Sequence, residues 1–403
     1  MKHFARLLLT VITALFAGCV PEELCFRELP ADDPNAPLVV AALLPLSGEN
    51  RMYAEQMQEG LLAAQNKINR YGINGRQLQL EFIDTKGTFS GSADALKLAG
   101  DKQAVAAVAG YDSEEVSMLI PHAAKMRMPM VIPLATSDYH LQTSPFIYRN
   151  SFSNIQQTEV LANFLVHWRQ KSRGAIITDP SGDDEYTREI SRDFAQAITD
   201  IGGKITMNIT LEANSLLSDG QLRSMLMAEP GFILISARGK RAAEQLKSLR
   251  QAGFTGIICG ADCWDDQEFI FSLEGSEPGD CVFTAFFNEE NSSREFRTFR
   301  KEFREKFYHY PGACETQSYD ALIFLAIGLD NADNLWDFDR NWRTIRNHHG
   351  VSGLYTMLKK GEIDRTIYLK TIGVDRRSGK PVPFARFSKK LQHSDLKNYR
   401  IIE

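Results

Sequence analysis

The sequence predicts an α/β protein of two lobes, each a doubly wound parallel sheet with helices on its faces. The length favours two lobes, because 403 residues exceed what one ordinary hydrophobic core holds. Short apolar runs alternate with amphipathic stretches, as in chains that form parallel sheets. The alternation starts afresh after residue 152, which indicates two similar halves in succession. An apolar fraction of 43% and a charged fraction of 24% are typical of a globular protein.

The first half is expected to contain four strands joined by helices. We place the strands at residues 39–44, 77–84, 105–109 and 130–134. Asn74 and Gly75 mark the turn before the second strand, and a helix over residues 92–101 follows that strand. This order of elements is that of a doubly wound unit.

The second half repeats the pattern. We place its strands at residues 175–178, 204–211, 232–235 and 256–259, and its helices at 157–170, 185–201 and 240–251. A further helix, over residues 292–308, carries four phenylalanines along one stripe: Phe296, Phe299, Phe303 and Phe307. A stripe at this spacing is more typical of core packing than of an aromatic binding box.

Residues 104–136 predict a shelf that can hold a ligand. The apolar run before Gly110 stops at that glycine, and Ser113 is expected to be the N-cap of the next helix, whose first turn is acidic. The following strand stops at Ala135 and Thr136. Because the carboxyl ends of adjacent parallel strands meet at one edge of a sheet, Ser113 and Thr136 are expected to face one pocket.

Residues 1–18 have the pattern of a lipoprotein signal peptide. A positively charged start precedes an apolar core too short to span a bilayer, and Cys19 follows. Cleavage before Cys19 would leave a lipid-anchored N-terminus, with residues 19–37 as a flexible tether. Such signals usually have leucine three residues before the cysteine, where this chain has Phe16. The alternative is a plain secretory leader in which Cys19 has no role; in both cases the protein is exported.

Export places the other cysteines in an oxidising compartment. They are Cys25, Cys259, Cys263, Cys281 and Cys314, an odd number, so at least one does not pair within the chain. A bridge among Cys259, Cys263 and Cys281 is possible, and the pairing stays open. The three residues between Cys259 and Cys263 do not match the usual zinc spacing.

Charge and motifs exclude several classes of function. A net charge of −5 and a pI near 6.0 argue against a nucleic-acid partner. The sequence has no P-loop, no zinc-protease motif and no complete dinucleotide fingerprint, and it places no histidine beside Ser113. The acidic residues Asp262, Asp265 and Asp266 do not follow the register of a calcium loop. We therefore expect no enzyme, no cofactor and no metal ion.

Several short motifs together resemble a known family. They are G-x-x-S at 110–113, P-x-A-A-K at 121–125, P-x-A-T at 133–136, PLSG at 45–48, NRYGINGR at 69–76, Asp84, GAD at 260–262 with Trp264, and SYDA at 318–321. Over residues 38–375 the chain resembles the type I periplasmic binding proteins, specifically their leucine/isoleucine/valine-binding branch. The resemblance implies that three chain crossings form a hinge between the lobes. It also implies lobe 1 at residues 38–152 and 286–350, and lobe 2 at 153–285 and 351–403.

The resemblance further implies a set of ligand contacts. In that family the serine and threonine at the positions of Ser113 and Thr136 hold an amino-acid carboxylate. The ammonium group meets the carbonyl oxygen at Ala135 and the acid at Asp262. The family's two aromatic contacts fall on Tyr53 and Tyr186, although Thr187 stands where the family usually has glycine. Arg238 lies near a further second-lobe contact position, where a guanidinium could pair with an acidic or polar ligand.

The implied function is that of an extracytoplasmic substrate-binding lipoprotein of an ABC-type importer. It would bind a free amino acid, branched-chain or related, between two closing lobes and deliver it to an ABC permease in the inner membrane. The lipid anchor would hold it at the membrane, facing the periplasm or the cell exterior. The alternative is a non-transport lipoprotein on the same fold that acts as a sensor or as an activator of an envelope enzyme.

Overall fold

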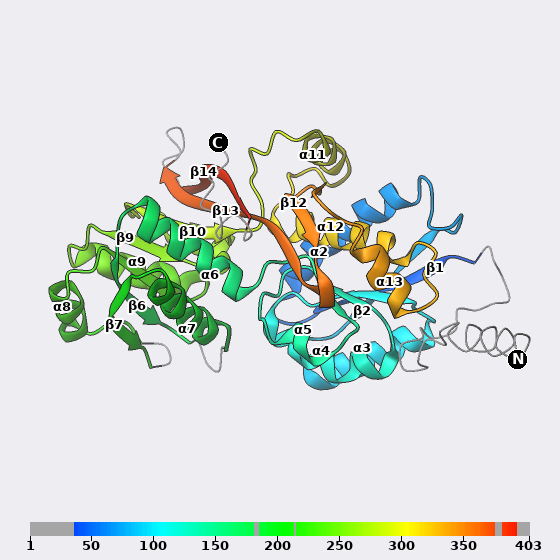
Figure 1. Ribbon diagram of the computed structural model, residues 1–403, viewed down its shortest axis with the longest axis horizontal. Coiled ribbons are helices and arrows are strands. Elements are labelled where there is room, and N and C mark those ends of the chain that lie inside the picture. The colour runs from blue at the N-terminus through cyan, green and yellow to red at the C-terminus, as the bar shows by residue number, and fades with distance from the viewer. Residues whose placement is uncertain (1–35, 181–184, 213–214, 375–380, 393–403) are drawn as a thin grey trace, which may run out of the picture.

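The computed structural model describes residues 36–180, 185–212, 215–374 and 381–392 (Figure 1). The expected signal peptide, Cys19, Cys25 and nearly all of the expected tether lie outside these ranges. Two α/β lobes lie side by side along the longest axis, the first on the right in Figure 1 and the second on the left. The predicted fold class is therefore confirmed.

The first lobe is built on a parallel sheet of five strands in the order β2-β1-β3-β4-β5. The strands are β1 (Leu38–Leu44), β2 (Leu78–Asp84), β3 (Ala106–Ala109), β4 (Met130–Ile132) and β5 (Ile147–Arg149). The four predicted strands correspond to β1 to β4, whereas β5 was not expected. All four strand pairs are parallel, so the carboxyl ends of the strands share one edge.

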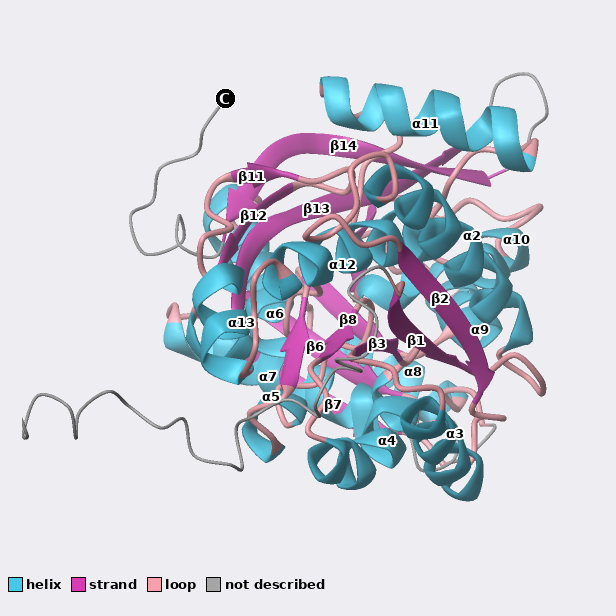
Figure 2. Cartoon of the chain, turned by 90° about the vertical axis from the view of Figure 1, so that its right-hand side faces the viewer, coloured by secondary structure: helices cyan, strands magenta, loops and turns pink. Residues whose placement is uncertain are grey.

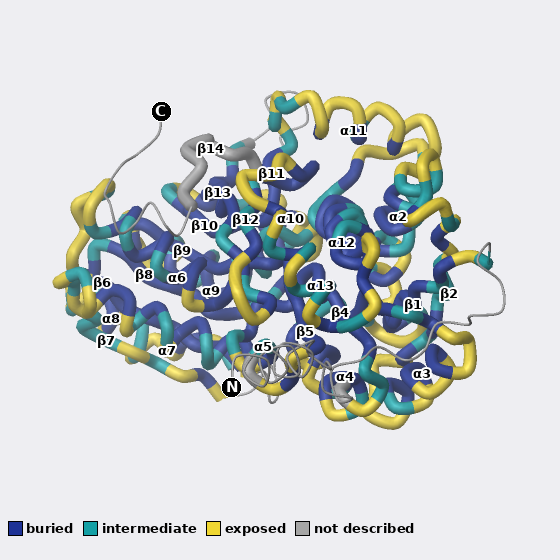
Figure 3. The backbone as a smooth tube through the Cα atoms, turned by 45° about the vertical axis from the view of Figure 1, so that its right-hand side comes forward, coloured by how far each residue is buried: buried dark blue, intermediate teal, exposed yellow. Residues whose placement is uncertain are grey.

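Helices cover both faces of the first sheet. They are α2 (Arg51–Ile68), α3 (Phe89–Asp101), α4 (Ser113–Met126), α5 (His140–Thr143), α12 (Ala313–Leu329) and α13 (Leu335–Trp342). Residues of α3 and α4 form one core with Ala41, Leu43 and Ile83, while α2 and α12 pack on the opposite face. Figure 3 shows α12 at the centre of the molecule, and most of its residues are buried.

The second lobe is built on a mixed sheet whose antiparallel end reaches the first lobe (Figure 1). Its parallel part runs β7-β6-β8-β9-β10, and antiparallel strands extend it beyond β10. The parallel strands are β6 (Arg173–Thr178), β7 (Lys204–Thr210), β8 (Phe232–Ser236), β9 (Ile257–Gly260) and β10 (Cys281–Ala285). The added strands are β11 (His348–His349), β12 (Leu354–Met357), β13 (Ile363–Val374) and β14 (Pro381–Gln392), of which β13 and β14 pair along a long antiparallel ribbon (Figure 2).

The predicted helices of the second half are present. They are α6 (Asn154–Asn163), continued by a π-helical turn at Phe164–Trp168, α7 (Glu185–Asp200) and α9 (Gly239–Gln251). Two shorter helices, α8 (Asp219–Met227) and α10 (Gln267–Ser272), were not predicted. Helix α11 (Arg294–Phe307) follows β10. Its residues Phe296, Phe299 and Phe303 are buried with Phe287 and Val351, which confirms that the phenylalanine stripe is core. The outer face of α11 is exposed (Figure 3).

Arg365 on β13 joins three segments that pass between the lobes. Its guanidinium, 1% exposed, donates to the carbonyl oxygen of Asn150 at 2.8 Å and to that of Phe286 at 2.6 Å. Asn150 follows β5, and Phe286 follows β10. Hydrogen bonds from a buried charge contribute about 1.5–3 kcal/mol each, so this one side chain ties the crossings together. The lobe limits given above stay predictions.

No disulfide joins the described cysteines Cys259, Cys263, Cys281 and Cys314, so the bridge considered among the second-lobe cysteines is not formed. Strand register explains why Cys259 and Cys281 do not pair. On adjacent parallel strands Cys259 lies opposite Val282, and Cys281 lies opposite Ile258. Because successive side chains alternate between faces, the two sulfurs belong to cores on opposite sides of the sheet.

Candidate ligand-binding cleft

A cavity of about 730 Å³ is lined by residues of both lobes. All seven residues predicted to contact a ligand line it: Tyr53, Ser113, Ala135, Thr136, Tyr186, Arg238 and Asp262. The first four come from the first lobe and the last three from the second. The structure thus brings together residues more than two hundred positions apart, such as Tyr53 and Asp262. Their part in binding stays a prediction.

The shelf of the first lobe forms at the carboxyl ends of β3 and β4. Gly110 turns the chain after β3 with a φ of +79°, a left-handed conformation that favours glycine. Helix α4 starts at Ser113, but its cap is Asp112, whose Oδ1 accepts from the backbone N–H of Glu115 at 2.9 Å. The expectation that Ser113 is the N-cap is therefore wrong by one residue. Because Asp112 accepts the hydrogen bond from a backbone N–H in the first turn of α4, the Ser113 hydroxyl is not used as the cap.

The two stretches of the shelf are tied to each other. Ser113 Oγ accepts from the backbone N–H of Ser137 at 3.2 Å, directly beside Thr136. Thr136 is 1% exposed, and its carbonyl oxygen accepts from the N–H of Asn154 at 2.9 Å. The carbonyl oxygen of Ala135 accepts from Ser151 Oγ at 2.7 Å and retains a second lone pair. Hydroxyl groups, a carbonyl oxygen and the first turn of α4 therefore meet on one wall of the cavity.

Tyr53 of α2 supplies an aromatic wall with Tyr111. The two rings stack with centroids 4.2 Å apart and planes 9° from parallel. Burial, together with the carboxylate of Asp266, raises the pKa of Tyr53 above its usual value. Tyr111 was not among the predicted site residues. Its position directly after Gly110, beside the shelf, was the available signal.

Asp262 is the acidic group of the second-lobe wall. Its Oδ1 accepts from Tyr186 Oη at 2.6 Å and from Gln157 Nε2 at 2.7 Å. The hydrogen bonds that described side chains donate to this carboxylate both go to Oδ1. Oδ2 is therefore available to a ligand. Burial raises the pKa of Asp262, which the bonds from Tyr186 and Gln157 oppose. Gln157 lies 105 residues away in the middle of α6, and nothing in its local sequence marks it.

Arg238 lies against the same tyrosine. Its guanidinium carbon is 4.2 Å from the centroid of the Tyr186 ring, a cation–π contact. The positive charge of Arg238 lowers the pKa of both Tyr186 and Asp262, against the larger effect of burial. Thr187, which stands where the resembled family usually has glycine, is buried within α7. It has no positive φ, so the backbone at this position does not require glycine.

The three aspartates after β9 turn to three different partners. Asp262 binds Tyr186, Asp265 pairs with Lys370 at 2.8 Å, and Asp266 accepts from Tyr53 at 2.6 Å. Glu289 also pairs with Lys370, whose side chain is fully buried, at 2.7 Å. Burial raises the pKa of Asp265 to about 6, although the Lys370 charge opposes this. The aspartates therefore serve separate contacts at the cavity wall.

No helix in the described part of the chain is long and apolar enough to cross a membrane.

Residues 37–365 match the family described as "Periplasmic binding protein". The chain belongs to the periplasmic binding protein family. Its fold is that of the type I members, and its motifs resemble those of the leucine/isoleucine/valine-binding branch. Proteins of this family and its solved relatives are binding proteins.

Named relatives agree with this assignment. The chain is 28% identical over 263 residues to the "Leu/Ile/Val-binding protein BraC3" of Rhizobium johnstonii. The aligned region covers 62% of this chain and 68% of that protein. The fold is similar to that of the branched-chain amino-acid transporter substrate-binding protein LivJ from Streptococcus pneumoniae in complex with isoleucine. That likeness has a TM-score of 0.73 at 20% identity, over 88% of this chain and 99% of LivJ.

A second solved structure has a different ligand. The fold is also similar to that of a solute-binding protein of an ABC transporter from R. palustris, solved in complex with benzoate. That likeness has a TM-score of 0.68 at 18% identity, over 87% of this chain and 96% of the other. At such identities the likeness concerns the fold alone.

Proposed function

We propose that this protein is the extracytoplasmic substrate-binding lipoprotein of an ABC-type importer and that it binds a free amino acid between its lobes. One observation carries the proposal. Ser113, Ala135 and Thr136 from the first lobe line the same cavity as Asp262 from the second. Acceptors and donors for a zwitterion thus come from opposite lobes.

The chemistry of the two walls suits the two charges of an amino acid. Hydroxyl groups beside the first turn of α4 can hold a carboxylate, because a helix N-terminus presents free N–H groups and a positive dipole end. The carbonyl oxygen of Ala135 and the carboxylate of Asp262 can accept from an ammonium group. A ligand held from both sides binds better when the lobes are together, so it shifts the population towards that arrangement. We propose that an ABC permease in the inner membrane recognises the closed form.

The side chain of the ligand is the less constrained part of the proposal. The relative BraC3 is named for leucine, isoleucine and valine, and LivJ was solved with isoleucine, which favours a branched-chain or related amino acid. Arg238 favours an acidic or polar group at the second-lobe wall, where its guanidinium lies over Tyr186.

A binding screen tests the proposal. The mature protein is heated with each of the twenty amino acids and with benzoate, and compounds that raise the melting temperature are measured by calorimetry. We expect at least one amino acid to bind with one-to-one stoichiometry. Stabilisation by benzoate alone, or by none of the compounds, would contradict an amino-acid ligand and would favour the sensor or activator role on the same fold.

A further inference from the structure

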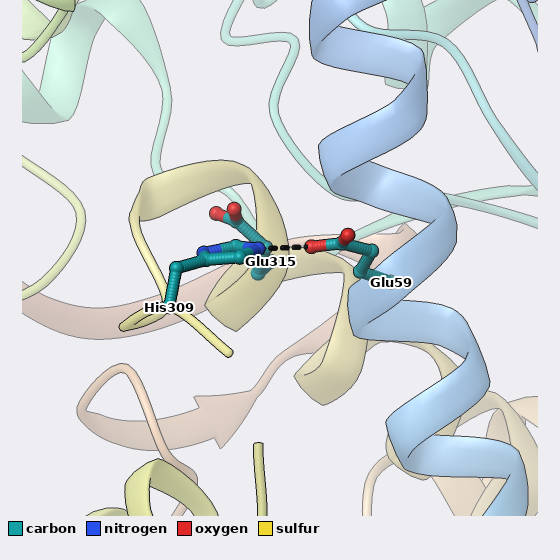
Figure 4. A group of neighbouring side chains, drawn as sticks. All are labelled: Glu59, His309 and Glu315. Carbon is teal, nitrogen blue, oxygen red and sulfur yellow. Dashed lines mark hydrogen bonds and ion pairs between the residues drawn. The ribbon is translucent and has the colours of Figure 1, made fainter. Parts of the chain in front are cut away.

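Three side chains of the kinds that bind metal ions converge beside the ligand cavity. They are Glu59 on α2, His309 in the loop before α12, and Glu315 in the first turn of α12 (Figure 4). One ligand atom from each lies within 4.8 Å of the others. Glu59 is 250 positions from His309, so no sequence motif announces the group.

The imidazole of His309 faces an oxygen atom at each of its nitrogens. Nδ1 lies 3.1 Å from the carbonyl oxygen of Tyr310, and Nε2 lies 2.7 Å from Glu59 Oε2. A carbonyl oxygen only accepts, so Nδ1 carries a hydrogen and the Nε2 side points at a carboxylate. Either a proton on Nε2 or a metal ion in its place can bridge this nitrogen and the carboxylate oxygen. Histidines that bind metals commonly donate their other N–H to a backbone carbonyl in this way.

Glu315 adds a buried carboxylate to the group. Its side chain is 3% exposed, and Oε2 accepts from the backbone N–H of Gly312 at 2.9 Å. Within the described ranges no lysine or arginine forms an ion pair with this carboxylate, and burial raises its pKa to about 7, an effect that the nearby His309 opposes. A buried carboxylate is costly unless a charge or a metal compensates it. A cation shared with His309 and Glu59 would supply that charge.

The backbone holds the two glutamates close together. Gly60 follows Glu59, and a Cβ atom at Gly60 would lie 2.2 Å from the carbonyl oxygen of Glu315. Only glycine lets α2 approach α12 this closely. Glu59 and His309 are 31% and 47% exposed, so their side chains can turn towards an ion held by the more rigid Glu315.

We propose that Glu59, His309 and Glu315 form a binding site for a divalent transition-metal ion of the zinc class. One imidazole nitrogen and two carboxylate oxygens are donors that zinc accepts, and water would complete a tetrahedral shell. Zinc-bound donors lie about 2.0–2.2 Å from the ion, so a modest contraction of the group is required. His309 and Glu315 both line the ligand cavity, so the ion would fasten one cavity wall to α2.

Zinc chloride is the probe for this site. The mature protein is stripped with EDTA, and zinc binding is followed by calorimetry and by the melting temperature. We expect one zinc ion per chain and a rise in melting temperature that EDTA reverses. Cobalt(II) in place of zinc should give visible absorption bands of a tetrahedral or five-coordinate site.

Matched variants locate the site. His309→Gln, Glu59→Gln and Glu315→Gln should each weaken zinc binding at least tenfold, and the last keeps an acceptor for the Gly312 N–H. The controls are Glu55→Gln, one turn earlier on α2 and exposed, and His167→Gln, also exposed; both should bind zinc as the parent does. Circular dichroism of the stripped proteins checks that each variant is folded. No zinc binding by the parent, or equal binding by parent and all three site variants, would overturn the proposal, whatever amino acid the cleft binds.

Discussion

Tyr53 donates a hydrogen bond from its hydroxyl to Asp266 Oδ2 at 2.6 Å and thereby joins the two lobes at the cavity. Tyr53 lies on α2 of the first lobe, while Asp266 caps α10 of the second lobe by accepting from the N–H of Glu268 at 2.7 Å. The bond spans 213 positions of the sequence. It is a contact between the lobes in addition to those made at the crossings by Arg365.

Tyr53→Phe tests whether this bond holds the lobes together. Phenylalanine keeps the ring that stacks on Tyr111 but removes the donor to Asp266. Because a net hydrogen bond is worth about 0.5–1.5 kcal/mol, ligand affinity should fall roughly two- to tenfold. X-ray scattering should give a larger radius of gyration at equal ligand concentration. Tyr71→Phe, at a site that is 88% exposed, is the control. Unchanged affinity and scattering in Tyr53→Phe would contradict a closing role.

Asp262→Ala tests the proposed zwitterion site. The change removes the carboxylate that accepts from Tyr186 and Gln157 and that would face the ammonium group. Charge-assisted hydrogen bonds contribute about 1.5–3 kcal/mol, so amino-acid affinity should fall at least tenfold by calorimetry. Asp219→Ala, on the exposed start of α8, should leave affinity unchanged. If Asp262→Ala binds the amino acid as tightly as the parent does, the assignment of Asp262 is wrong.

Arg238→Ala tests the preference for the ligand side chain. If the guanidinium pairs with an acidic or polar ligand, the variant should lose at least tenfold in affinity for that ligand and little for leucine. Lys240→Ala, an exposed neighbour on α9, is the matched control. If the parent binds leucine and valine tightly and Arg238→Ala binds them equally well, the ligand is a branched-chain amino acid and Arg238 has no role in its recognition.

Glu115 gives the fold a dependence on pH. Burial raises its pKa from 4.5 to about 7, although Thr85 and the N–H of Tyr111 donate to its carboxylate. The folded state therefore favours the protonated acid. The resulting stability is complete below pH 4.5 and is lost as the pH rises through about 7. A pKa shift of this size corresponds to on the order of 3–4 kcal/mol.

Glu115→Gln should therefore raise the melting temperature relative to the parent at pH 8 and have little effect at pH 5. The amide can still accept from Tyr111 and can donate to Thr85 Oγ1. Glu114→Gln, on the exposed side of the same helical turn, should show no such pH dependence. A stability difference between parent and Glu115→Gln that is the same at both pH values would argue against the raised pKa.

Cys19→Ala tests the lipid anchor. If Cys19 is the first residue after cleavage, the variant should fail to incorporate labelled palmitate and should appear in the soluble envelope fraction. Cys25→Ala, six residues later, should stay with the membrane. Membrane retention of Cys19→Ala equal to that of the parent would favour the plain secretory leader.

The local pattern of the sequence was sufficient for much of the fold. Strands β1, β3, β4, β6, β8 and β9 are short apolar runs that end at small or polar residues, and such runs are readable because an inner parallel strand is buried on both faces. Strand β13 was missed because it carries Arg365 and Lys370, which are typical of exposed sequence. Both are buried by partners that come from distant segments.

The candidate site likewise has a part that the sequence predicts and a part that only the tertiary structure shows. The sequence by itself determined that Ser113 and Thr136 share a shelf, because parallel strands end at a common edge and each stop is local. Only the tertiary structure decided that Cys259 and Cys281 face opposite ways and that His309 meets Glu59. Register, helix contact and lobe position set these relationships. They depend on how remote segments pack, which no spacing within one segment encodes.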